Sequence, residues 1–80
     1  MEETAGFING NKLRRHILEV LNSKGAMDAK RIAKTLRCIP ATTDKTIAEV
    51  EAAGLIFKNG DGKYDLTPDG KYAVDFIRSV

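Results

Sequence analysis

The segment from Leu55 to Leu66 constrains the fold more than any other part of this 80-residue chain. Upstream of it, apolar residues recur at helical spacing, whereas Leu55-Ile56-Phe57-Lys58 and Lys63-Tyr64-Asp65-Leu66 have the composition of short strands. Between them, Asn59-Gly60-Asp61-Gly62 supplies residues that tolerate a tight reversal. The pattern predicts an antiparallel β-hairpin set among helices.

Two helices are predicted at the start of the chain's main body. The first begins with Asn11 as its N-cap and stops at Gly25, and the second begins at Asp28 and runs to about residue 36 or 37. Each carries an apolar stripe at helical spacing. The expected inward residues are Leu13, Ile17, Val20 and Leu21 in the first helix and Ala29, Ile32, Ala33 and Leu36 in the second.

Two further helices flank the hairpin. One occupies roughly Thr42 to Ala53, after the break at Cys38-Ile39-Pro40 and before Gly54, with Thr43, Ile47 and Val50 facing the core. The last begins with Thr67 as its cap and Pro68 in the favoured first position. Residues 1–10 are expected to form a loose leader whose Phe7 and Ile8 can pack on the body, which leaves 11–80 as one α+β domain.

Charge is unevenly distributed along the chain. The net charge is only +2, but residues 11–40 contain eight Lys and Arg against Glu19 and Asp28. The second half of the chain is net acidic. This asymmetry indicates a basic face that could meet phosphates, although a solvated helix surface has the same composition.

Three stretches in this order resemble the winged helix-turn-helix family, in particular the MarR- and ArsR-like regulators. Residues 28–36 are similar to the first helix of the motif. Residues 43–56 end in an E-x-x-G-L-I sequence, and residues 64–70 read Y-x-L-T-P-x-G, as at the second wing strand and the helix after it. The resemblance implies a three-helix core, a β-hairpin wing, a C-terminal helix, and binding of double-stranded DNA in transcription regulation.

The resemblance also implies which residues meet DNA. The helix at 42–53 would enter the major groove and the wing at 55–66 would touch the backbone or the minor groove. Outward residues on the reading helix could contact base edges, and basic residues elsewhere could bind phosphates. The candidates are Thr42, Asp44, Lys45 and Thr46 on the reading helix, Lys30, Arg31, Lys34 and Arg37 on the preceding helix, and Lys58 and Lys63 on the wing.

The predicted reading helix is itself acidic, with Asp44, Glu49 and Glu51 against Lys45. A helix dipole favours Asp44 in the first turn, and Glu51 lies toward the helix end, but the residues offer no reason for Glu49 on the outward face. A negatively charged helix is unfavourable beside a polyanion. An alternative therefore stays open, in which the domain is an adapter that docks on another protein.

Other chemistries find little support in the residue pattern. His16 has no second His or Cys at metal-ligand spacing, and Cys38 cannot form a disulfide within the chain. With one His, no catalytic triad can be assembled, so we expect no enzyme activity, cofactor or metal. The N-terminus lacks a signal-peptide pattern and no apolar run is long enough for a membrane span, so a cytoplasmic protein is expected.

Apolar residues near both ends exceed what a small core is expected to absorb. They are Phe7 and Ile8 before the first helix and Phe76, Ile77 and Val80 at the end of the last. The resemblance implies that such terminal segments can form a homodimer. The simpler interpretation is that they complete the monomer's core.

Overall fold

The computed structural model describes residues 2–79. Three of its helices have an N-cap residue whose polar side chain accepts a backbone hydrogen bond. Asn11 Oδ1 accepts hydrogen bonds from the backbone N–H groups of Leu13, at 2.8 Å, and Arg14, at 3.3 Å. Asp28 Oδ1 and Thr67 Oγ1 each accept one from the residue three positions on. Because the first N–H groups of a helix have no partner inside it, these caps set where each helix starts.

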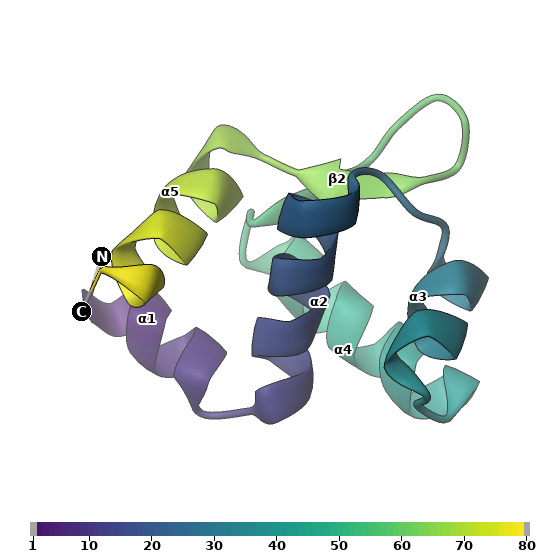
Figure 1. Ribbon diagram of the computed structural model, residues 1–80, viewed down its shortest axis with the longest axis horizontal. Coiled ribbons are helices and arrows are strands. Elements are labelled where there is room, and N and C mark those ends of the chain that lie inside the picture. The colour runs from purple at the N-terminus through teal and green to yellow at the C-terminus, as the bar shows by residue number, and fades with distance from the viewer. Residues whose placement is uncertain (1, 80) are drawn as a thin grey trace.

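The elements surround one central helix (Figure 1). In chain order they are α1 (Glu2–Asn9), α2 (Lys12–Lys24), α3 (Ala29–Leu36), α4 (Pro40–Ala52), β1 (Ile56–Lys58), β2 (Tyr64–Leu66) and α5 (Pro68–Arg78). Helix α2 contacts α1 and α5 on one side and α3 and α4 on the other, and the hairpin lies across one end of the assembly. The helices and the two-stranded antiparallel sheet confirm the predicted α+β order.

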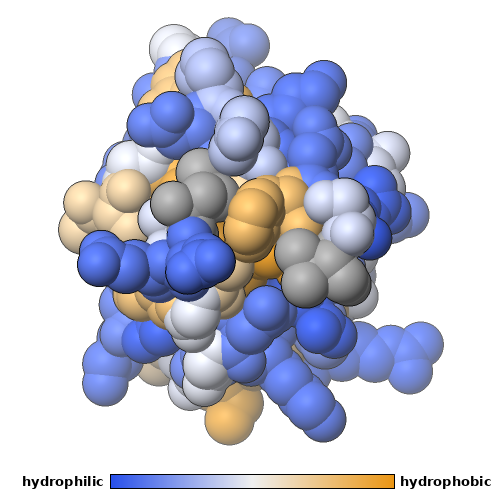
Figure 2. All heavy atoms as spheres, turned by 90° about the vertical axis from the view of Figure 1, so that its left-hand side faces the viewer, coloured by the Kyte–Doolittle hydropathy of each residue, from blue (hydrophilic) through white to orange (hydrophobic). Residues whose placement is uncertain are grey.

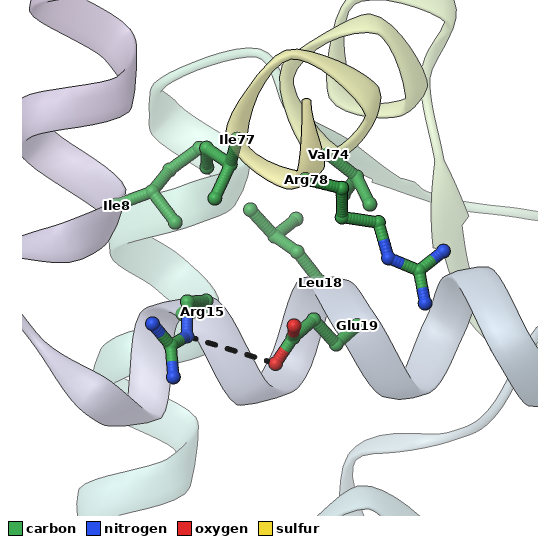
Figure 3. Close-up of a pocket in the computed structure, with 7 residues that line it drawn as sticks. All are labelled: Ile8, Arg15, Leu18, Glu19, Val74, Ile77 and Arg78. Carbon is green, nitrogen blue, oxygen red and sulfur yellow. Dashed lines mark ion pairs between the residues drawn. The ribbon is translucent and has the colours of Figure 1, made fainter. Parts of the chain in front are cut away.

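The expectation of a loose leader at residues 1–10 is wrong, because residues 2–9 form helix α1. Ile8 is fully buried and Phe7 packs against the core, as the sequence allowed. Ile8 points toward α2 and α5, where Leu18 and Val74 meet it around a cavity of only about 10 Å³ (Figure 3). Such close packing makes α1 part of the folded body.

The core of the domain is continuous from α1 to α5. The predicted inward residues of α2, α3 and α4 are buried or partly buried, and Leu18 joins them although the sequence pattern did not select it. The fully buried side chains of largest volume are Ile8, Ile17, Leu18, Leu21, Ile32, Ile56, Val50 and Thr43. Val80, predicted to add apolar surface, lies outside the described residues.

Helix α4 begins two residues earlier than predicted. Pro40 occupies its first turn and Ile39 is the N-cap residue, so the helix covers Pro40–Ala52 and not Thr42–Ala53. Proline has no N–H to leave unsatisfied at this position, and its ring fixes a φ suited to a helix start. The early start places Thr42 inside the first turn of the helix.

The hairpin forms where predicted, with Phe57 opposite Asp65 in the register. The Asn59 side chain stabilises the loop: its Oδ1 accepts hydrogen bonds from the N–H groups of Asp61, at 2.9 Å, and Lys63, at 3.0 Å. Gly62 has φ +78°, a conformation that side-chain-bearing residues rarely adopt. Backbone hydrogen bonds between Met27 and Tyr64, at 3.0 and 2.7 Å, join the hairpin to the entrance of α3.

Gly70 allows α5 to approach the backbone of Leu55, which lies between α4 and β1. A Cβ atom built on Gly70 would lie 1.9 Å from the carbonyl oxygen of Leu55 and 2.9 Å from its carbonyl carbon. Backbone atoms cannot move aside as a flexible side chain can. The glycine of the Y-x-L-T-P-x-G stretch is therefore required by packing.

Gly70→Ala is expected to lower the free energy of unfolding by about 2 kcal/mol or more, since α5 must shift away from Leu55. Gly6→Ala is the matched control: it is also helical, its added methyl meets no atom within 4 Å, and it should be neutral or stabilising by up to about 1 kcal/mol. Urea denaturation of both variants checks the pair. Equal stabilities would contradict the close approach.

Candidate nucleic-acid interface

Helix α3 presents a basic face to solvent. Ile32 and Ala33 are buried against the core and Ala29 and Leu36 pack on it, so helical periodicity turns the other positions outward. All four predicted cations of this segment are exposed: Lys30, Arg31, Lys34 and Arg37. Arg37 is the C-cap residue of α3 and has the left-handed conformation, with φ +55°. Its N–H donates to the carbonyl oxygens of Ala33 and Lys34 in the last turn.

Cations from α3 and from the wing meet at one hollow. Arg31 and Lys63 both line a depression of about 340 Å³, together with Lys24, Ala26, Met27 and Asp28. The Met27–Tyr64 bridge brings these segments together, because it ties the wing to the start of α3.

Lys24 was not among the predicted phosphate contacts. Its position in the last turn of α2, just before the chain turns toward Asp28, is the signal that could have suggested it.

The outward face of α4 carries three of the four residues predicted for base contact. Thr42, Asp44 and Lys45 are exposed, and the exposed residues Ala41 and Ala48 leave room beside them. The small side chains at those two positions would let another molecule approach the helix backbone closely.

Thr46 does not lie at the surface as predicted. It is 4% exposed, and its hydroxyl donates a 2.9 Å hydrogen bond to the carbonyl oxygen of Thr42. Thr43, correctly expected to be buried, likewise donates to the carbonyl of Ile39, at 3.0 Å. Both hydroxyls are thus satisfied inside the helix, and Thr46 has no surface with which to reach a phosphate or a base.

Glu49, expected on the outward face, is turned toward α2. Its Oε1 lies 3.3 Å from Nε of Arg14, and both side chains are partly buried. Arg14 also donates from Nη1 to the carbonyl oxygen of Phe7, at 2.8 Å, and its guanidinium lies 4.1 Å from the centre of the Phe7 ring. The carboxylate that the sequence left unexplained is therefore paired with a cation two helices away in the chain.

The wing carries its cations at the ends of its two strands. Lys58 is exposed at the end of β1, opposite Tyr64, with Nζ 5.8 Å from the centre of the Tyr64 ring. Lys63 is exposed at the end of the loop. Their placement on the wing agrees with the predicted positions.

Side chains that could serve other chemistry are scattered. Cys38 is half-buried with Sγ 3.4 Å from the carbonyl oxygen of Leu36, and His16 is exposed on α2. Residues 2–79 contain no group of three or more His, Cys, Asp or Glu arranged to hold a metal ion. Across the same range, every helix is too short or too polar to cross a bilayer.

The helix pair α3–α4, joined by a short turn and followed by an antiparallel hairpin and α5, defines a winged helix-turn-helix fold. The structure superimposes on that of a transcriptional repressor, CouR, bound to p-coumaroyl-CoA, with a TM-score of 0.77 and 18% sequence identity. The match covers 84% of this chain and 49% of that one, so the chain spans about half the length of the repressor. No protein-family model matches the sequence, and a comparison with curated proteins finds no match.

Thr46→Lys should lower the free energy of unfolding by about 2 kcal/mol or more, because it forces an ammonium group into a closed position. Thr42→Lys adds the same charge one turn away at an exposed position and should change stability by no more than about 0.5 kcal/mol. Thermal unfolding without any ligand compares them. If Thr46→Lys were as stable as Thr42→Lys, the burial of Thr46 would be contradicted.

Proposed function

We propose that the chain binds double-stranded DNA as a transcription regulator, with α4 in the major groove and the wing on the backbone or in the minor groove. The observation that carries the proposal is the convergence of Arg31, Lys63 and Lys24 at one hollow beside the exposed cations of α3. A surface that collects positive charge from three elements is suited to a phosphate backbone. That the structurally similar protein CouR is a transcriptional repressor supports it.

Contacts to bases fall to the outward face of α4 in this proposal. Lys45 can donate to the guanine acceptors or to a phosphate, Thr42 can contact a thymine methyl group or a phosphate, and Asp44 can accept from cytosine N4. The remaining cations bind phosphates and set the register of the domain on the duplex. They are Lys30, Arg31, Lys34 and Arg37 on α3 and Lys58 and Lys63 on the wing.

The acidity of α4 weighs less against DNA binding than its sequence indicates. Glu49 is paired with Arg14 on the side of α4 that faces α2. Because α4 begins at Pro40, Asp44 lies beyond its first turn and does not gain the dipole stabilisation expected from the sequence, and Glu51 lies near the other end of the helix. The protein-docking adapter thus loses Glu49 as an observation in its favour, while Asp44 and Glu51 stay exposed, and it is the outcome expected if DNA is not bound.

Homodimerisation through the terminal helices is also proposed. The side of the molecule with α1 and α5 shows apolar side chains among polar ones (Figure 2). Ile8 is taken up by the monomer's core and Ile77 packs against it, so the residues left for a partner are on the outer face of α5. There Tyr72 is 61% exposed and Phe76, one turn on, is half-buried.

Titration with random-sequence duplex DNA tests the regulator. If about five cations neutralise phosphates, log affinity should fall with log salt concentration with a slope near −4 to −5. Lys45→Ala and Lys63→Ala should each weaken binding, and Lys63→Ala should reduce the slope by about 1. Lys71→Ala removes the same charge from α5 and should leave the slope unchanged. Absence of binding at low salt would favour the adapter.

Sedimentation at high micromolar concentration tests the dimer. The chain should sediment as a dimer, and Tyr72→Lys should sediment as a monomer, since it places a charge at an interface while disturbing little in the exposed environment of a single chain. Thermal unfolding of the variant controls for its fold. A monomeric wild-type chain at that concentration would remove dimerisation from the proposal.

A further inference from the structure

One ion pair joins the reading helix to the start of the domain. Arg14, in the first turn of α2, contacts Glu49 on α4 and the carbonyl oxygen and ring of Phe7 on α1. The side chains of Arg14 and Glu49 are 21% and 35% exposed, so the pair is partly shielded from water and counterions. Three helices therefore meet at one guanidinium.

Only an arginine can make this set of contacts. The Nε–H is directed at the carboxylate and the Nη1–H at the Phe7 carbonyl, while Cζ of the guanidinium lies over the Phe7 ring. A lysine ammonium has the same charge but concentrates its donors at one point on a flexible stem, so it cannot reproduce the directions and the stacking together.

Glu49 has a second cation within reach on its own helix. Lys45 precedes it by four residues, a spacing that places two side chains side by side on a helix surface. Among the described residues, however, the ion-pair partner of Glu49 is Arg14, and Lys45 forms no ion pair. Without Arg14, the carboxylate would be free to neutralise Lys45 or to face the DNA phosphates.

We propose that Arg14 is a positioning residue for DNA reading: it holds the Glu49 carboxylate on the α2 side of α4, which leaves the Lys45 ammonium available to DNA. The inference rests on the proposed function. It assigns a role to a pair whose direct contribution to stability is expected to be small, as is usual for partly exposed ion pairs. The effect of Arg14 is transmitted through Glu49 alone.

A charge-balanced mutant cycle tests this role. The four chains are the wild type, Arg14→Lys, Glu49→Gln and the double variant, titrated by fluorescence anisotropy against a labelled duplex of roughly two helical turns selected by the wild type from a random pool. Arg14→Lys keeps the net charge, so long-range attraction to DNA is the same within each pair of chains. Thermal unfolding confirms that each variant is folded.

Arg14→Lys should weaken binding roughly threefold or more in the wild-type background, the effect of one unscreened charge near a phosphate or a contacting lysine. In the Glu49→Gln background the same substitution should have no effect, since a neutral amide does not oppose DNA binding. Glu49→Gln alone should bind at least as tightly as the wild type, whereas a merely structural Arg14–Glu49 pair would make Glu49→Gln weaken binding as Arg14→Lys does.

Three results would overturn the proposal. Unchanged affinity of Arg14→Lys, or equal weakening in both backgrounds, would do so while leaving DNA binding itself intact. Failure of the wild type to select or bind any duplex would reject the proposed function and this role with it. If Arg14→Lys does not fold, Glu49→Asp decides: its shorter side chain withdraws from Arg14 but keeps the charge near Lys45, so unchanged affinity would reject the role.

Discussion

The junction around Leu55 determines how α4, the hairpin and α5 are held together. The Leu55 N–H donates to the carbonyl of Val50 in α4, at 3.1 Å, and its carbonyl accepts from the N–H of Thr67, at 3.0 Å. The Thr67 hydroxyl donates to the carbonyl of Gly54, at 2.6 Å, and accepts from the N–H of Gly70, at 3.0 Å. Within a few residues, the end of α4, the hairpin and the start of α5 share hydrogen bonds, and the missing side chain of Gly70 permits that approach.

This junction bears on the proposed function, because reading DNA with α4 and the wing would need the two at a fixed separation. The wing is held at a second point by the backbone bridge between Met27 and Tyr64. That bridge also brings Lys63 beside Arg31 at the basic hollow. The backbone hydrogen bonds at the two ends of β2, Tyr64 to Met27 and Thr67 to Leu55, fix the position of the hairpin. Cations that are distant in sequence therefore lie on one surface. Backbone hydrogen bonds between the hairpin and the start of α3 therefore determine that Lys63 lies beside Arg31.

Local features of the sequence predicted most of the fold. Asn11, Asp28 and Thr67 act on backbone groups within three residues, so their role as caps follows from residue type and position. Features that depend on distant neighbours were not predicted. Packing of Phe7 and Ile8 on the body was expected, but not the helix α1 that carries them, and the period of α4 alone could not decide whether Thr46 is buried or exposed. The candidate site divides in the same way, since exposure of the α3 cations follows from periodicity, whereas the hollow shared by Lys24, Arg31 and Lys63 follows from tertiary pairing.

The charge of α4 shows why the composition of one helix is a poor guide to its electrostatic role. Glu49 is unfavourable for DNA binding if only the charges of α4 are considered, because its ion-pair partner, Arg14, lies on α2. The cation that compensates it stands 35 residues earlier, and is itself oriented by a carbonyl and a ring on α1. If α4 enters the major groove as proposed, Glu49 opposes DNA binding less than its charge indicates, because the field on the outer side of α4 is set by the Arg14–Glu49 pair and not by the carboxylate alone. Through the same contacts α1, which the sequence predicted to be a loose leader, becomes part of the environment of Glu49 on α4.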